Sequence, residues 1–155
     1  MGTVHAEITL KNITDEAFVR GGYIRPEEIR TATVTAVVDT GSMYLVITEE
    51  LRKKLGLAIK TEKTVRTANG QRVICNVTES VEIIWKDRDF TLPALVLHGA
   101  EKILLGVMAL EGLDLMVNPV TQELVGVHGD QMEIMALALN SPQLFYYSEQ
   151  YAGTQ

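Results

Sequence analysis

The sequence predicts an all-β, barrel-like domain that carries only one or two short helices. Short runs of apolar and β-branched residues recur along the chain, and glycine-containing turns separate most of them. Helix-like patterns are confined to two short stretches, near residues 49–56 and 107–112. The chain has 155 residues, 46% of them hydrophobic, which is enough for one domain with a sizeable core.

The N-terminal part of the chain predicts two strands that pair as a hairpin. Residues 4–10 alternate between apolar and polar, which indicates a half-buried strand. Residues 31–38 are mostly valine, threonine and alanine, and they predict a strand buried on both faces. Residues 12–30 contain Gly21-Gly22 and Pro26, so they predict an exposed connection or hairpin tip between these strands.

The second strand leads directly into Asp39-Thr40-Gly41-Ser42. A carboxyl at the end of a buried strand is unfavourable unless it is paired or hydrogen-bonded. Gly41 allows a sharp turn in which its N–H faces the carboxylate, and Thr40 offers a hydroxyl. Asp and Gly are also ordinary turn residues, so these four residues alone leave open a structural turn without chemistry.

The middle of the chain predicts a helix and a hairpin. Residues 45–47 form a short apolar run, and Thr48 stands where a helix N-cap is expected. Glu49 and Glu50 suit the positive end of that helix, and Gly56 ends it. Asn69-Gly70 lies between strand-like residues 64–67 and 72–77, which is a strong hairpin signal.

The later part of the chain predicts further strands and a second short helix. Residues 73–85 form a strand, residues 86–89 a charged turn, and residues 90–97 a strand that Pro93 marks as an edge or a bulge. Residues 107–112 form the helix, and residues 113–117 and 124–127 form strands around an Asn118-Pro119 turn. We expect the domain to span residues 1–129. Residues 130–155 form a C-terminal extension, either a tail or a segment that packs on a partner.

Composition excludes several classes of partner and cofactor. The net charge is −6 and no stretch is strongly basic, so no nucleic-acid partner is expected. The histidines His5, His98 and His128 lie far apart, so neither a metal site nor a cofactor is expected. Cys75 is the only cysteine, which fits a reducing cytoplasm and a small core residue rather than a nucleophile. No signal peptide or membrane-spanning run is apparent, so no membrane partner is expected.

Three elements occur in an order that resembles the retropepsin-like aspartic proteases, the one-lobe relatives of pepsin. They are Asp39-Thr40-Gly41-Ser42 after an apolar strand, the Asn69-Gly70 hairpin, and Ile103-Leu104-Leu105-Gly106 before a short helix. The resemblance runs from about residue 4 to residue 127. Within that family, the sequence looks most similar to the bacterial and retrotransposon-type members. The resemblance implies a single-lobe retropepsin-like acid-protease barrel.

The resemblance implies a pair of carboxylates that activates water for attack on a peptide carbonyl. One carboxylate is ionised and takes a proton from the water, while the other is neutral and donates to the carbonyl oxygen. This chain has one Asp-Thr-Gly and no Asp-Ser-Gly, so the resemblance implies that a second copy supplies the partner of catalytic Asp39. A homodimer acting on a peptide or protein substrate is therefore expected.

The resemblance also gives roles to the residues around the expected catalytic Asp. Thr40 hydrogen-bonds across the two-fold axis, and Gly41 contributes backbone contacts on the substrate side. Ser42 completes the catalytic loop, and we expect its hydroxyl to donate to the carboxylate and to lower its pKa. The remaining roles are a flap over the substrate and a support beneath the loop. The flap residues are Ala68, Asn69, Gly70 and Gln71, and the support residues are Leu104, Leu105 and Gly106.

Two other functions remain open at the level of sequence. The fold can serve as a non-catalytic module for peptide binding or assembly. Alternatively, the segment 130–155 can bind across the cleft of an active enzyme and silence it until the segment is removed.

Overall fold

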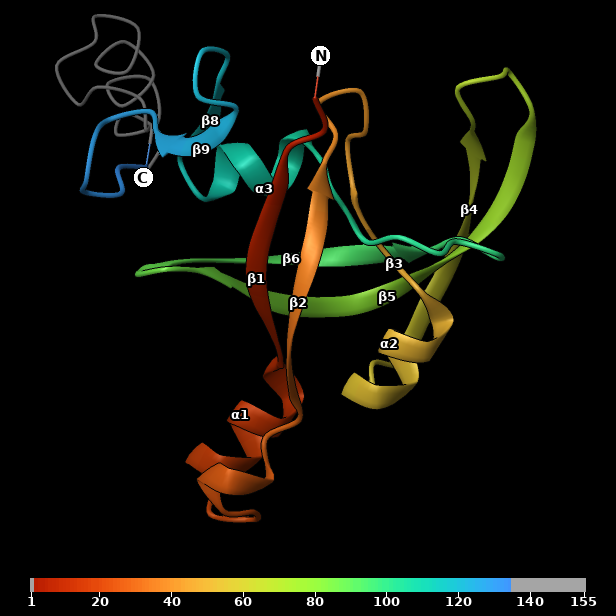
Figure 1. Ribbon diagram of the computed structural model, residues 1–155. Helices are drawn as coiled ribbons and strands as arrows, with labels where there is room; N and C mark the ends of the chain where they lie inside the picture. Colours follow the sequence, from red (N-terminus) through yellow and green to blue (C-terminus); the bar gives the residue numbers. More distant parts are fainter. Residues whose placement is uncertain (1, 135–155) are drawn as a thin grey trace, which may run out of the picture.

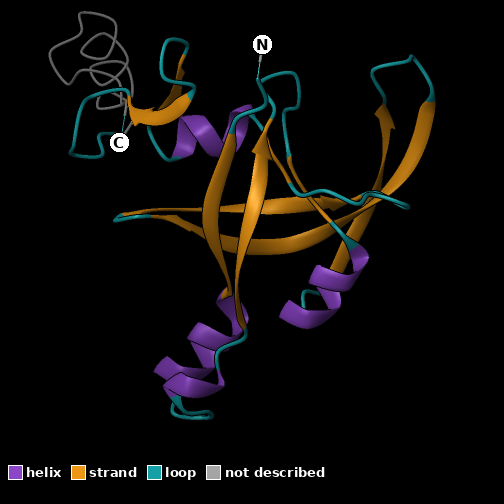
Figure 2. Ribbon diagram, viewed as in Figure 1, coloured by secondary structure: helices purple, strands orange, loops and turns teal. Residues whose placement is uncertain are grey.

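The computed structural model describes residues 2–134 and consists mainly of strands (Figures 1 and 2). The expected all-β class is confirmed. The elements in chain order are β1 (His5–Asn12), α1 (Ile13–Arg20), η1 (Pro26–Glu28), β2 (Thr31–Val38), β3 (Leu45–Ile47), α2 (Glu49–Leu55), β4 (Ile59–Arg66), β5 (Arg72–Trp85), β6 (Arg88–Val96), β7 (Leu104–Leu105), α3 (Val107–Gly112), β8 (Leu115–Asn118) and β9 (Glu123–Gly126). The expectations for residues 135–155 lie outside the described part.

Seven strands form one sheet whose pairings close into a ring. The order is β1-β2-β7-β3-β6-β5-β4, and β1 also pairs with β5, so β4 extends outward from β5. The strands β8 and β9 form a separate two-stranded sheet. Ile8, Leu10, Ile83 and Leu105 are among the fully buried side chains inside the ring. Because the ring is closed, most strands pack one face against the core and turn the other face toward solvent.

The strand β2 is exposed on its outer face, so the expectation of burial on both faces is wrong. Ala32 and Ala36 are buried, whereas Thr31, Thr33 and Thr35 are exposed. The sheet curls around its own core, and within residues 2–134 no second layer covers its outside at this strand. β-branched threonine suits an exposed strand face as well as a buried one, so the residue types alone did not separate the two cases.

The connection between β1 and β2 contains a helix, which corrects the expectation of an exposed loop or hairpin tip. The side chain of Asn12 accepts a hydrogen bond from the Asp15 N–H at 3.0 Å and thereby caps α1. The same side chain donates to the Leu55 carbonyl at 2.8 Å, which ties α1 to the end of α2. The antiparallel pairing of β1 with β2 is nevertheless confirmed. With α1, the described residues contain three α-helices, one more than expected.

Several local predictions are confirmed. The Thr48 side chain accepts from the Leu51 N–H at 3.1 Å and caps α2, which ends at Gly56 in the left-handed conformation. The Asn69-Gly70 hairpin joins β4 to β5. The pairing of β5 with β6 shifts register opposite Pro93, so that proline marks a bulge rather than an edge.

The charged turn 86–89 is shorter than expected, because β6 already begins at Arg88. The Arg88 side chain is buried, with 2% exposure. Its guanidinium donates to the carbonyls of Leu113, Asp114 and Gly129, so the cation is held by backbone oxygens as well as by an acid. A charged turn in sequence did not reveal this internal role.

Candidate active site

Asp39 lies at the point where β2 leaves the ring, in a loop that a neighbouring strand holds in place. The Asp39 N–H donates to the Leu105 carbonyl at 3.0 Å, and the Val37 N–H donates to the Ile103 carbonyl at 2.8 Å. The loop then turns back, since the Ser42 N–H donates to the Asp39 carbonyl at 3.1 Å. Asp39 is half-buried rather than buried, whereas Thr40 and Gly41 are exposed.

The Asp39 carboxylate receives a backbone hydrogen bond from its own loop. The Gly41 N–H donates to Asp39 Oδ1 at 2.9 Å, as the sequence predicted. Within residues 2–134 the carboxylate takes part in no ion pair, and no second acid completes a pair with it. The chain therefore presents one oriented carboxylate on an exposed loop.

The Ser42 hydroxyl does not contact the carboxylate, so the expectation of a Ser42–Asp39 hydrogen bond is wrong. Ser42 Oγ donates instead to the Tyr44 carbonyl at 3.2 Å, across the end of the loop. The loop geometry causes this, because the turn brings the Gly41 N–H, and not the Ser42 hydroxyl, to the carboxylate. The role of Ser42 in this chain is to hold the loop.

Gly106 lies directly beneath the loop, where the sequence resemblance put a structural support. A Cβ atom at this position would lie 2.5 Å from the carbonyl oxygens of both Ser42 and Tyr44. The next residues fasten the loop to α3, since the Val107 N–H donates to the Ser42 carbonyl at 2.8 Å and the Met108 N–H to the Met43 carbonyl at 3.0 Å. Leu104 and Leu105 pair with Val37 and Val38 of β2 on the other side. The predicted support element and the Asp39 loop thus form one unit.

The tip of the β4–β5 hairpin contains the four predicted flap residues, and all of them are exposed. The Thr67 N–H donates to the Gln71 carbonyl at 2.8 Å, and the Asn69 side chain bonds with the Thr67 hydroxyl inside the turn. Gly70 has a φ of 84°, which favours glycine. In Figure 1 the hairpin tip and the loop after β2 lie on the same side of the ring, opposite α1. This placement suits a flap, and that role remains a prediction.

The base of the hairpin packs on a small core of its own. Val46, Cys75, Val77 and Leu95 are buried together there, with Tyr44 packed against them. Burial raises the pKa of the Cys75 thiol, which fits the expected core role. The β4–β5 hairpin is therefore anchored at its base, while its tip is exposed.

Two buried acids lie away from Asp39 and hold segments of the chain together. Asp15 receives two hydrogen bonds from the Arg30 guanidinium and one from the Arg30 N–H, each at 2.9 Å. The side-chain hydrogen bond from Arg30 lowers the pKa of Asp15 below its ordinary value of 3.8, against the opposing effect of burial. This pair closes the base of the inserted helix.

Asp114 is the second buried acid, and it forms a cluster with the buried Arg88 and the partly exposed His128. His128 Nδ1 lies 2.8 Å from Asp114 Oδ1, the Glu133 N–H donates to Asp114 Oδ2 at 3.0 Å, and Arg88 lies 3.6 Å from the same carboxylate. Burial raises the pKa of Asp114, but the bonds from Glu133 and His128 shift it downward overall. Sequence reasoning missed this cluster, because its members lie far apart in the chain and share no local pattern.

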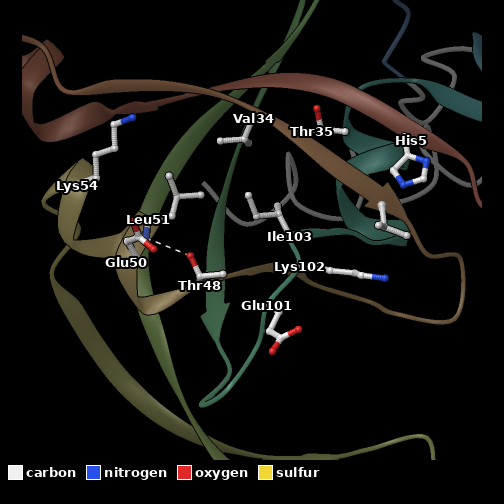
Figure 3. A pocket seen from close by; sticks show the side chains of 11 residues that line it. His5, Val34, Thr35, Thr48, Glu50, Leu51, Lys54, Glu101, Lys102 and Ile103 are labelled. Carbon is white, nitrogen blue, oxygen red and sulfur yellow. Dashed lines mark hydrogen bonds between the residues drawn. The ribbon is translucent and has the colours of Figure 1, made fainter.

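A mixed pocket of about 460 Å³ lies between β2, α2 and residues 101–103 (Figure 3). Its apolar lining includes Val34, Leu51 and Ile103, and charged side chains from α2 and from residues 101–102 surround it. Neither Asp39 nor its loop is among the lining residues. The pocket is thus separate from the candidate catalytic loop.

Among the described residues, no helix is both long and apolar enough to cross a membrane. Residues 2–134 also contain no group of three or more histidine, cysteine or acidic side chains arranged to hold a metal ion.

Comparisons with known proteins relate the chain to aspartic proteases. The sequence profile described as "gag-polyprotein putative aspartyl protease" matches residues 27–112, more than half of the chain. Among the solved structures that resemble the chain is a retropepsin-like aspartic protease from Rickettsia conorii. The identity is 18%, the TM-score is 0.42, and the match covers 70% of this chain and 68% of that one. A search of curated proteins found no match.

Proposed function

Because the chain belongs to the family of gag-polyprotein aspartyl proteases, we propose that it is a homodimeric aspartic endopeptidase built around Asp39 of two chains. The matched residues include the Asp39 loop, the hairpin tip and Gly106. The retropepsin-like membership that the sequence predicted is thereby confirmed, whereas the dimer and its chemistry are the proposal.

The observation that carries the proposal is a single oriented carboxylate without a second acid. The sequence contains Asp-Thr-Gly once, and the Asp39 carboxylate is paired with no other acid of the described chain. A water-activating pair needs two acids in close contact. A two-fold axis that passes between two copies of the Asp39 loop supplies the second acid, and it uses the same surface of both chains.

The proposed reaction follows from two like charges held close together. Both carboxylates cannot be ionised at that distance, so the pair shares one proton and titrates as a unit. The ionised member accepts a proton from water, which attacks the peptide carbonyl, and the neutral member donates its proton to the carbonyl oxygen. The Gly41 N–H orients one oxygen of the carboxylate, which leaves the other for water or for the partner.

The neighbouring residues take supporting roles in this proposal. Thr40 is exposed beside the carboxylate and bonds across the axis, while Ser42 and Gly106 fix the loop from below. The tip residues Asn69 and Gly70 close over a bound peptide. A moving lid is consistent with a hairpin anchored at its base and exposed at its tip.

The test is peptidase activity on a library of unfolded peptides, for the native chain and for Asp39→Asn. We expect Asp39→Asn to lose activity by at least about three orders of magnitude, because it removes the base and the shared proton. Asp87→Asn is the matched control, since Asp87 is exposed in the β5–β6 turn. Activity per chain should also rise with protein concentration and fall with a peptidomimetic inhibitor of aspartic proteases.

The non-catalytic module is the outcome that replaces this proposal. A folded native chain that binds peptides but cuts none, and that behaves like Asp39→Asn in every assay, would establish it.

A further inference from the structure

The strand β4 forms an edge of the seven-stranded sheet. It pairs with β5 on one side, and within residues 2–134 no strand pairs with its other side. Seven of its eight residues are exposed, and only Val65 is half-buried. In Figure 1, β4 lies on the side of the ring away from β9. A long exposed edge of this kind is a template for the addition of another strand.

The register of the β4–β5 hairpin determines which backbone groups face this edge. The Thr67 N–H donates to the Gln71 carbonyl at 2.8 Å, so these residues form a hydrogen-bonded pair at the end of the hairpin. Hydrogen-bonded and non-hydrogen-bonded pairs alternate along an antiparallel ladder. Glu62, Thr64 and Arg66 therefore belong to non-hydrogen-bonded pairs, and their N–H and C=O groups point away from β5. These groups have the spacing that an extended peptide needs for pairing.

Two arginines lie opposite each other on the outer face of the same hairpin. Arg66 and Arg72 are register partners, and both are exposed. Side chains alternate between the two faces of a strand, and Val65 packs against the small core of the hairpin, so the arginines project from the other face. Their pair is not hydrogen-bonded, which brings the side chains closer together. Like charges at opposite positions destabilise a sheet, and an anionic partner relieves the repulsion.

The charge of the hairpin is opposite in sign to that of the whole chain. Residues 59–74 contain four cations and one acid, a net charge of +3, whereas the chain carries −6. Within residues 2–134, neither Arg66 nor Arg72 takes part in an ion pair. Ile74 is the register partner of Thr64 on the same face, and it is 67% exposed. The outer face of the hairpin thus combines two cations with an exposed apolar side chain.

We propose that an extended, acidic segment of another protein adds to the edge of β4 as a further strand. Its backbone pairs with Glu62, Thr64 and Arg66, and its acidic side chains lie beside Arg66 and Arg72. Main-chain pairing supplies affinity in this mode of binding, and the alternate side chains supply specificity. The docking edge is on the outside of the sheet and does not include the Asp39 loop.

Charge complementarity selects this occupant over two others. A second copy would place β4 beside another strand with three cations and one acid, and the like charges would repel. Residues 135–155 of the same chain contain a single acid, Glu149, so they offer one charge to two arginines. An acidic segment of another protein satisfies both the backbone groups and the arginines.

The first test is binding of a fluorescent octapeptide that alternates glutamate with valine, measured by anisotropy on the full chain. The Asp39→Asn background prevents cleavage of the probe, so the result does not depend on the proposed peptidase activity. We expect saturable binding that weakens as salt is added. The same peptide with glutamine in place of glutamate should bind about tenfold more weakly. Equal binding of the two peptides, or no saturable binding of the acidic one, would overturn the proposal.

A pair of double variants tests the role of the arginines. Arg66→Gln/Arg72→Gln should weaken binding of the acidic peptide about tenfold. Arg20→Gln/Lys86→Gln makes the same change in net charge at exposed positions outside the hairpin, and it should leave binding within about twofold of the unsubstituted chain. Equal losses in the two variants would mean that net charge alone attracts the peptide, and the site would be rejected.

Thr64→Pro tests the strand addition itself. The proline removes an N–H that faces the open edge, while the pairing of β4 with β5 keeps its hydrogen bonds. We expect thermal unfolding close to that of the unsubstituted chain and a loss of peptide binding of about tenfold. Unchanged binding would show charge attraction without strand addition. A smaller sedimentation coefficient of the variant alone would assign the edge to a second copy, and either result would overturn the proposal.

Methylation of the probe gives the same information without any change to the protein. Only one alternate set of N–H groups in an added strand faces β4. N-methylation of that set should abolish binding, whereas N-methylation of the other set should leave most of it. Similar effects of the two methylated peptides would contradict strand addition.

Discussion

At the scale of single residues, the Asp39 carboxylate is held by a backbone donor and not by a side chain. The Gly41 N–H contacts it, and the nearby Ser42 hydroxyl contacts the Tyr44 carbonyl. The sequence allowed either hydroxyl or backbone to serve as the donor, because both follow the acid directly. Only the path of the turn decides between them.

This geometry gives Ser42→Ala a structural effect. We expect a loss of stability of about 1 kcal/mol from the missing hydrogen bond to Tyr44. Because the hydroxyl does not contact the carboxylate, the acidic limb of the pH–rate profile should stay in place. Thermal unfolding and a pH–rate profile measure the two effects, and an acidic limb displaced toward higher pH would restore the original Ser42 hypothesis.

The ion pair between the buried Asp15 and the half-exposed Arg30 predicts how the stability of the protein changes in acid. The pKa of Asp15 is lowered in the fold, so its contribution is complete well above the ordinary value of 3.8 and is lost as the pH falls through the lower folded value. Arg30→Gln removes the partner and leaves the acid buried. We expect this substitution to destabilise the protein at neutral pH. The difference in unfolding free energy between the variant and the native chain should become smaller below pH 3.8.

Denaturant unfolding at several pH values measures this difference. Arg25→Gln is the control, because the pairs of Arg25 with Glu27 and Glu28 are exposed and contribute little. If the difference in unfolding free energy between Arg30→Gln and the native chain stayed constant down to the lowest pH, the stabilising role of the Asp15–Arg30 pair would be contradicted.

At the scale of elements, the predictable parts were those with local signals. Thr48 as an N-cap, Gly56 as a stop and Asn69-Gly70 as a turn each specify their element within a few residues. The helix α1 also has a local signal, because Asn12 precedes Asp15 and Glu16, but this signal lies in a stretch whose glycines and proline indicate a loop. The outer face of β2 had no local signal, because its exposure depends on how the sheet closes.

The support beneath the Asp39 loop predicts the behaviour of Gly106→Ala. An added Cβ would lie 2.5 Å from two carbonyl oxygens of the loop, so the loop or α3 must move. We expect a loss of about 1–3 kcal/mol in stability and a larger loss in kcat than in substrate affinity. Unfolding and steady-state kinetics provide both values.

Gly21→Ala is the matched control for this substitution. Its added Cβ meets the exposed ring of Tyr23, which can move aside. If Gly106→Ala were as stable and as active as Gly21→Ala, the packing of Gly106 under the loop would have no role in holding Asp39.

At the scale of the whole molecule, the Asp39 loop and the inserted helix α1 lie on opposite sides of the ring. The Asp39 loop and the hairpin tip lie together on one side in Figure 1, and the inserted helix lies on the opposite side. The sequence identified the residues of the first side through motifs of adjacent residues. It could not identify the Arg88–Asp114–His128 cluster, whose members are joined only by the fold.

The central claim is that one active site needs Asp39 from two chains, and subunit mixing tests it most directly. Native and Asp39→Asn chains are co-expressed in equal amounts, so that they assemble at random, and activity is compared with the same total amount of native protein. If both carboxylates are required, only native–native dimers cut, and the activity falls to about a quarter. An activity of about half would mean that each Asp39 works alone, and it would contradict the account.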